Sequence, residues 1–152
     1  MSAEARLAQL EVDLPPPPQP VGAYTRAVRT GDLIFVAGQL PMAAGRLEHT
    51  GKVGSELSLE QGRAAARLCA LNALSVLREE TGSLDRVARI VRLVGYVASA
   101  PGFTGQTQVM NGASELLGEV FAERGVHARV AVGVCELPRG AAVELEVIAQ
   151  VE

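Results

Sequence analysis

Residues 128–151 read ARVAVGVCELPRGAAVELEVIAQV, and this stretch decides the fold class. Two apolar runs, Ala128–Cys135 and Ala142–Val151, flank Leu137–Gly140, where proline and glycine are typical of a turn. Successive side chains of a strand point to opposite faces. One face of the last run therefore carries Val143, Leu145, Val147, Ala149 and Val151, and the other carries Glu144, Glu146, Ile148 and Gln150. The stretch predicts two strands with one face packed on a core.

An earlier strand is predicted at Arg89–Ala98. Strict alternation places Val91, Leu93 and Val97 on one face, and Ile90, Arg92, Val94 and Tyr96 on the other. Arg92 and Tyr96 would then join Glu144 and Glu146 on a face that is half apolar and half charged. This mixed composition is expected if another subunit covers the face. It is also expected if the face is an ordinary solvated one with scattered valines.

Two long helices complete the pattern. Ser58 and Gln61 form a capping box that starts a helix running to Glu80, and Gly82 supplies its stop. A second helix is predicted from Thr104 to Arg124, ended by Gly125. Its core-facing stripe, at helical spacing, is Val109, Ala113, Leu116, Leu117, Val120 and Phe121.

The remaining segments set the architecture. Ser2–Leu10 predicts a short helix, and Asp13–Pro20 a polyproline stretch laid on the surface. Tyr24–Thr30 and Asp32–Ala37 predict a hairpin, Met42–Val53 predicts an irregular loop or short strand, and Ser83–Val87 predicts a helical turn. We expect residues 1–20 to form an N-terminal helix and arm. Residues 21–152 should form one two-layer α+β domain, a mixed six-stranded sheet with two long helices on one face.

Composition excludes several function classes. The chain has 152 residues, 48% hydrophobic and 20% charged, which fits one globular domain. Its 17 acidic residues outnumber 14 basic ones, which argues against a nucleic-acid partner. No apolar run approaches the ~18 residues of a membrane span, and no signal peptide is visible, so we expect a cytoplasmic protein. The two cysteines and two histidines lack metal-ligand spacing, so we expect no metal.

Standard catalytic motifs are absent from the sequence. It has no G-x-S-x-G, no P-loop, no G-x-G-x-x-G after a strand and no H-E-x-x-H. Neither His49 nor His127 lies beside a candidate nucleophile along the chain, so a Ser-His-Asp arrangement has no support. The residues alone predict an oligomeric α+β domain and no particular reaction.

Four blocks resemble the Rid (YjgF-like) reactive-intermediate deaminase family, some of whose members are named endoribonuclease L-PSP. They are Val21–Tyr24, Leu33–Pro41, Ala128–Arg129 and Glu136–Ala149, in the family's order. The resemblance implies a chorismate-mutase-like fold and a homotrimer with clefts between subunits. It also implies hydrolysis of enamines and imines, such as 2-aminoacrylate, to 2-keto acids and ammonia without a cofactor. A non-catalytic trimer that binds small carboxylates is the alternative, and the acidic balance does not favour a ribonuclease.

The resemblance also implies roles for individual residues. Arg129 would anchor the substrate carboxylate, because a guanidinium fork binds a carboxylate through two parallel hydrogen bonds. Glu144 would hold the attacking water and relay a proton, with Glu146 as a second choice. Gly38 would let the backbone approach the ligand. Tyr24 would form one wall of the cleft, and Asn111 an inter-subunit or structural contact.

Four of these residues could instead have a purely structural role. Arg129 could form an interface salt bridge, Glu144 could pair with an arginine, Gly38 could serve a bulge, and Tyr24 could be a packing aromatic. The sequence also departs from the family pattern around the site. Ala23, Ala37, His127, Val130 and Ala131 stand where relatives carry Pro, Ser, Pro, Ser and Cys. Ala37 therefore brings no hydroxyl to the substrate-binding residues, and these departures leave the physiological substrate and the rate open.

Overall fold

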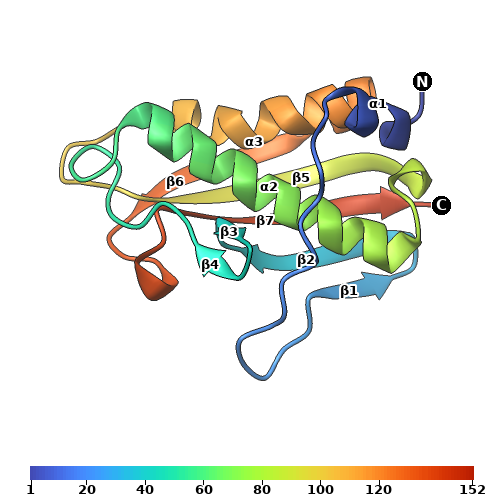
Figure 1. Ribbon diagram of the computed structural model, residues 1–152, viewed down its shortest axis with the longest axis horizontal. Helices are drawn as coiled ribbons and strands as arrows, with labels where there is room; N and C mark the ends of the chain where they lie inside the picture. Colours follow the sequence, from blue (N-terminus) through green and yellow to red (C-terminus); the bar gives the residue numbers. More distant parts are fainter.

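A five-stranded mixed sheet forms the base of the computed structural model, which describes all of residues 1–152 (Figure 1). The strands, in spatial order, are β1 (Ala27–Thr30), β2 (Leu33–Gln39), β7 (Val143–Val151), β5 (Val87–Ala98) and β6 (Ala128–Val134). Neighbouring strands are antiparallel except β5 and β6, which are parallel because a helix connects them. Strands β1 and β6 are the edges of the sheet.

The prediction of six strands in one sheet is wrong. Strands β3 (Met42–Ala43) and β4 (Arg46–Leu47) pair only with each other. The reason is local, because Ala44 and Gly45 both adopt positive φ, as a tight hairpin turn requires. The Asn72 side chain donates hydrogen bonds to the carbonyls of Leu40 (3.1 Å) and Met42 (3.0 Å), which fastens the start of this hairpin to the helix layer.

Helices α2 (Leu59–Thr81) and α3 (Gln106–Phe121) cover one face of the sheet (Figure 1). The capping box is confirmed. Gln61 N donates to Ser58 Oγ at 3.2 Å, and Ser58 N donates to Gln61 Oε1 at 2.8 Å. All six residues of the predicted core stripe of α3 are buried. This helix ends at Phe121 and continues as a 3-10 turn, η2 (Ala122–Gly125), so it is shorter than predicted.

Strand β5 does not alternate as predicted. Ile90 and Leu93 are both fully buried although they lie three positions apart, and Val91 is 36% exposed. The pairing of β5 with β7 shifts register between Ile90 and Arg92, so a bulge moves Ile90 to the core face. Beyond the bulge the prediction is confirmed, because Tyr96 lies opposite Glu144 and Val94 lies opposite Glu146. We call this side of the sheet, away from the helices, the open face.

The N-terminal segment packs against the helix layer. Ala3 and Leu7 of α1 (Ala3–Gln9) belong to the main hydrophobic core. The Glu4 carboxylate binds the Arg78 guanidinium and accepts a hydrogen bond from Leu84 N in the turn η1 (Leu84–Arg86). At the other end of the chain, Glu152 N donates to the carbonyl of Arg86 in the same turn, at 3.0 Å.

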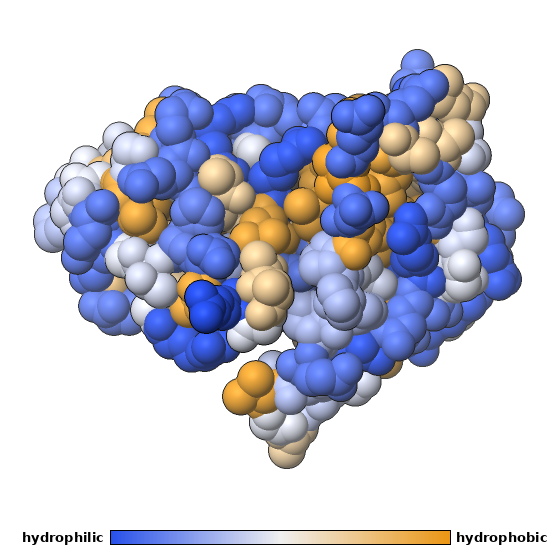
Figure 2. Space-filling model, viewed as in Figure 1, coloured by the Kyte–Doolittle hydropathy of each residue, from blue (hydrophilic) through white to orange (hydrophobic).

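The polyproline segment crosses α2 and is fixed by a hydrogen bond from Ser75 Oγ to the carbonyl of Pro15, at 2.6 Å. Figure 2 shows the helix-bearing side as mostly hydrophilic, with an apolar patch near this crossing. None of the helices is long and apolar enough to cross a membrane.

Candidate functional site

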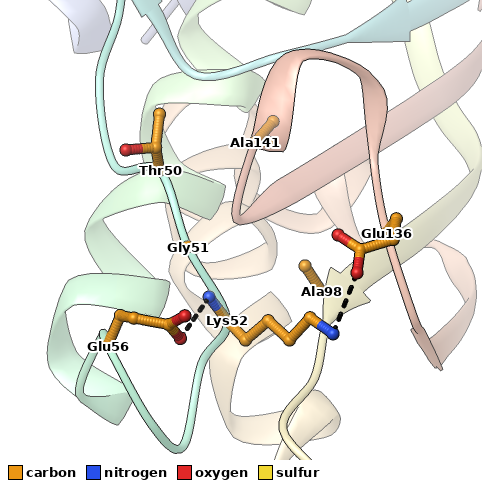
Figure 3. A pocket seen from close by; sticks show the side chains of 8 residues that line it. Thr50, Gly51, Lys52, Glu56, Ala98, Glu136 and Ala141 are labelled. Carbon is orange, nitrogen blue, oxygen red and sulfur yellow. Dashed lines mark hydrogen bonds and ion pairs between the residues drawn. The ribbon is translucent and has the colours of Figure 1, made fainter.

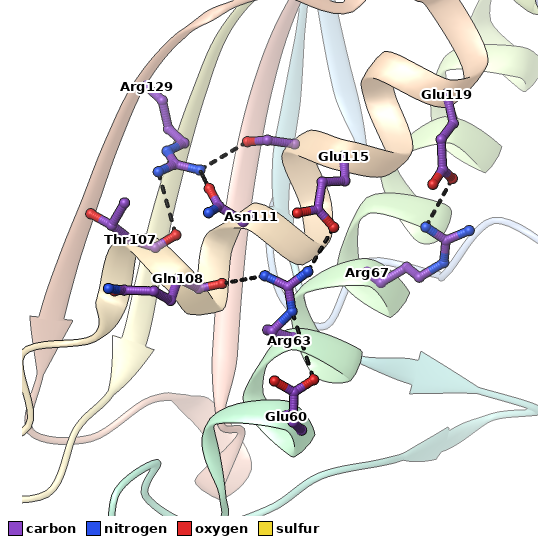
Figure 4. A network of polar contacts seen from close by, with 10 residues as sticks. Glu60, Arg63, Arg67, Thr107, Gln108, Asn111, Glu115, Glu119 and Arg129 are labelled. Carbon is purple, nitrogen blue, oxygen red and sulfur yellow. Dashed lines mark hydrogen bonds and ion pairs between the residues drawn. The ribbon is translucent and has the colours of Figure 1, made fainter.

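Arg129 lies near the start of the edge strand β6, and its side chain lies over α3. It pairs with Leu93, a core residue, so the guanidinium is on the helix side of the sheet. Its Nη1 donates to Asn111 Oδ1 at 2.8 Å and to Ser114 Oγ at 3.1 Å, and its Nη2 donates to the Thr107 carbonyl at 3.4 Å (Figure 4). These contacts use three of the five N–H groups that a guanidinium carries. Two N–H groups are left for an outside acceptor such as a carboxylate.

The neighbouring arginines are already paired. Arg63 binds Glu115 at 2.6 Å and Arg67 binds Glu119 at 3.1 Å, and these contacts tie α2 to α3 (Figure 4). Arg63 and Arg67 therefore have a structural role. Arg129 binds no carboxylate of its own chain, which leaves its charge for a ligand or for another chain.

His127 completes the surroundings of Arg129. Its Nδ1 lies 2.6 Å from the Gly125 carbonyl, which can only accept, so Nδ1 carries the proton of the neutral ring. Its Nε2 lies 3.0 Å from Ser114 Oγ and accepts from that hydroxyl. Burial lowers the pKa of His127, the Gly125 hydrogen bond opposes this, and the Arg129 charge adds to it. The sequence concealed this serine–histidine contact because β6 and α3 bring together residues that lie thirteen positions apart.

Glu144 lies on the open face, opposite Tyr96. It is half-buried, and its carboxylate accepts no hydrogen bond from its own chain. Burial raises the pKa of Glu144, and the charge of Glu146 raises it further. Burial likewise raises the pKa of Tyr96, with help from both glutamates. Both effects disfavour the ionised carboxylate, so Glu144 takes up a proton more readily than an exposed glutamate does.

Gly38 lies directly against Glu144. A Cβ atom built at Gly38 would collide with Glu144 Oε1. This position is also the bulge of β2, since the pairing of β2 with β7 shifts register between Val36 and Gln39. Within one chain, the group that lies against Gly38 is the Glu144 carboxylate, and the approach of the Gly38 backbone to a ligand stays a prediction.

Ala37 directly precedes Gly38 in β2, and Tyr24 lies in the segment before β1. Ala37 lines a shallow hollow of about 450 Å³ on the open face, together with Phe35, Arg92 and Glu146. Tyr24 is 55% exposed, and its hydroxyl accepts from Val21 N at 3.2 Å. It makes no hydrogen bond to Arg129 or Glu144.

Arg129 and Glu144 do not share a face of the sheet. Their partners on β5 are Leu93 and Tyr96, an odd number of residues apart, so the two side chains point to opposite sides. One chain therefore brings Arg129 together with Asn111, and Glu144 together with Gly38, but it does not join the two groups. A site that uses both needs a second copy of the chain.

A separate open pocket of about 280 Å³ lies where β5 and β6 end (Figure 3). Its principal charged group is Lys52, whose Nζ lies 3.0 Å from Glu136 Oε1. Hydrogen bonding and charge from Glu136 raise the pKa of Lys52, which favours its ammonium form.

Comparison with known proteins places the chain in a family. The family model described as "YjgF/chorismate_mutase-like, putative endoribonuclease" matches residues 4–150. The chain belongs to the YjgF family. The resemblance drawn from the four sequence blocks is thereby confirmed, as is the chorismate-mutase-like α+β fold.

Individual relatives of this YjgF-family chain cover nearly its whole length. Protein TCP17 of Trypanosoma cruzi is 44% identical over 147 residues, covering 96% of this chain and 92% of that protein. A 2-iminobutanoate/2-iminopropanoate deaminase of Dermatophagoides farinae is 27% identical over 142 residues, covering 93% and 95%. The crystal structure of Atu1372 from Agrobacterium tumefaciens, of unknown function, has a TM-score of 0.91 and 39% identity, covering 99% of this chain and 94% of that one.

Proposed function

We propose that this protein hydrolyses small 2-imino acids and their enamine tautomers to 2-keto acids and ammonia, at clefts between the subunits of a homotrimer. The observation that carries the proposal is the Arg129 guanidinium, held by α3 with two N–H groups left over. A planar fork with two free donors matches the carboxylate that every 2-imino acid carries. The relative named as a 2-iminobutanoate/2-iminopropanoate deaminase supports the same substrate class.

The reaction needs few groups. With 2-iminopropanoate, a water oxygen bonds to C2, the C=N π electrons move to nitrogen, and the water gives up a proton. Glu144 accepts that proton and delivers it to the nitrogen, which gives a carbinolamine with a hydroxyl and an NH2 group on C2. Glu144 then carries the hydroxyl proton to the NH2 group, the C–N bond breaks with its electron pair going to nitrogen, and ammonia leaves as the oxygen becomes the keto oxygen of pyruvate. The imine carbon is already electrophilic, so these steps require neither a metal nor an organic cofactor.

The proposed site combines two chains. Arg129, on an edge strand, would come from one subunit and Glu144, on the open face, from its neighbour. The open face has the surface for such packing, because Phe35, Val130 and Val132 are 42%, 41% and 39% exposed there in one chain. Burying these side chains against another copy is favourable by about 25 cal/mol per Å² of apolar area.

One observation favours a different function. Because Arg129 and Glu144 of one chain lie on opposite faces of the sheet, a carboxylate could bind at Arg129 without meeting a group that activates water. The second candidate is therefore a small-carboxylate binder of the same fold that does not catalyse hydrolysis.

A coupled assay separates the two functions. A pyridoxal-phosphate dehydratase generates 2-aminoacrylate from serine, and lactate dehydrogenase reports pyruvate. We expect pyruvate to appear faster than by spontaneous hydrolysis, at a rate proportional to added protein. Calorimetry with 2-ketobutyrate runs in parallel. Binding of 2-ketobutyrate without any acceleration would select the binder and reject the deaminase.

Gly38→Ala should impair the reaction without unfolding the protein. The backbone of Gly38 is not in the left-handed region, so alanine is free of φ strain, but its methyl group would displace the Glu144 carboxylate. We expect accelerated pyruvate release to fall about tenfold or more, within the range for removing a general base. Gly118→Ala is the matched control, because a Cβ there meets nothing within 4 Å. Equal activity of the two variants would contradict the close approach.

A further inference from the structure

We propose that Ser114 and His127 are positioning residues that fix the orientation of the Arg129 guanidinium toward a bound carboxylate. The inference rests on the proposed role of Arg129 as carboxylate anchor. It assigns a task to His127, which the reaction itself does not use.

The hydrogen bonds form a chain with one consistent direction. The Gly125 carbonyl at 2.6 Å fixes the proton on Nδ1 of His127, so Nε2 must accept. Ser114 then donates its only hydroxyl proton to Nε2 at 3.0 Å, and its lone pairs face Arg129 Nη1 at 3.1 Å. A neutral histidine thereby makes Ser114 an acceptor for the guanidinium.

This arrangement meets a need of the site. An arginine side chain has many rotamers to lose on binding, and Arg129 extends from an edge strand with no neighbouring strand beyond it. Two acceptors on α3, Asn111 and Ser114, hold the same nitrogen, Nη1, and so fix the plane of the fork. Outer groups that orient a binding residue in this way are needed for tight recognition.

The same contacts argue against a nucleophilic serine. Ser114 lies inside α3, and its oxygen already accepts from Arg129. Without His127, the Ser114 hydroxyl would turn to the carbonyl four residues earlier in the helix, as mid-helix serines do. Its lone pairs would then turn away from the guanidinium, and Arg129 would lose one of the two contacts that hold Nη1.

Two substitutions of His127 separate its two hydrogen bonds. In His127→Gln, the side-chain amide reaches the position of Nε2 and keeps an acceptor for Ser114. In His127→Asn, the amide reaches only the position of Nδ1 and keeps the bond to the Gly125 carbonyl. Ser114→Ala removes the link itself. Because both His127 variants are small changes at one partly buried position, they control for general effects on folding.

We expect His127→Asn and Ser114→Ala to raise the Kd for 2-ketobutyrate about tenfold, the worth of one hydrogen bond to a charged group. In the coupled assay KM should rise similarly while kcat stays within about twofold. His127→Gln should bind nearly as wild type, and the double variant Ser114→Ala/His127→Asn should bind no worse than either single variant. Additive losses, or equal damage by His127→Gln and His127→Asn, would overturn the assignment.

An NMR measurement on the ligand-free protein tests the positioning role independently of whether the protein is a deaminase. The resonance of the Arg129 Nη1 hydrogens, which donate to Asn111 and Ser114, should be sharp and slow to exchange in ligand-free wild type and in His127→Gln. It should be averaged by motion in His127→Asn and in Ser114→Ala. An identical resonance in all four proteins would overturn the proposal even if the protein is an active deaminase. The expected pattern would support the proposal even if the protein only binds carboxylates.

Discussion

Arg129→Ala should abolish accelerated keto-acid release while the assembly persists. Each hydrogen bond to a charged group is worth about 1.5–3 kcal/mol, so losing two to the substrate carboxylate predicts a fall in kcat/KM on the order of a hundredfold or more. The assembly should survive, because Arg129 makes its contacts to α3 of its own chain and packs nothing into the core. The coupled pyruvate assay measures the rate, and sedimentation measures the oligomeric state.

Two further variants sharpen this test. Arg129→Lys keeps the charge and loses the planar fork, so it should recover only a small part of the activity. Arg89→Ala is the control for removing a positive charge, because Arg89 is exposed and makes no hydrogen bond or ion pair. If Arg129→Ala released pyruvate as fast as Arg89→Ala, the anchor role would be untenable.

Glu144→Gln should remove catalysis while leaving binding intact. Losing a general base costs typically about 10²–10⁴-fold in rate, and the amide of glutamine cannot take a proton from water at neutral pH. We expect kcat to fall by that order and the Kd for 2-ketobutyrate to change little, since Glu144 does not contact Arg129. Glu146→Gln, two residues along the same face, is the matched comparison and should be milder. A larger loss in Glu146→Gln would transfer the role to that residue.

Glu144→Gln should also be more stable than the wild-type protein at neutral pH. Burial and Glu146 raise the pKa of Glu144 in the folded protein, so its ionised form is disfavoured there relative to the unfolded chain. The stability that Glu144 contributes is complete below the ordinary glutamate pKa of about 4.3 and is lost as the pH rises through the raised folded pKa. Glutamine is always neutral and avoids that loss. We expect Glu144→Gln to have the higher Tm at pH about 7.5 and no advantage at pH about 4; a constant difference would contradict the raised pKa.

Local signals in the sequence predicted most of the fold. The capping box at Ser58 and Gln61, the stripe on α3 and the alternation along β7 all involve residues a few positions apart, and the structure confirms each of them. The bulge at Ile90 and the separate β3–β4 hairpin were not predictable in this way. Both depend on which strands pair and in which register, and pairing is set by contacts distant in sequence.

For the candidate site too, the sequence predicted individual residues but not the contacts between segments distant along the chain. Family resemblance pointed to Arg129, Glu144, Gly38 and Asn111, and the structure groups them as two pairs, Arg129 with Asn111 and Glu144 with Gly38. That these pairs lie on opposite sides of the sheet follows from the register of β6 and β7 on β5, which no single segment contains. The link from Ser114 to His127 depends on the packing of α3 beside β6, and its only sequence signal was a histidine where relatives carry proline.

The turn η1 holds both extremities of the polypeptide: Glu4 bonds to Leu84 N near one end, and Glu152 N bonds to the Arg86 carbonyl at the other. Residues near both termini are thus hydrogen-bonded to the same three-residue turn. Fraying, which usually starts independently at each terminus, is here opposed at both by a single small element, and loosening that element would release the two ends together.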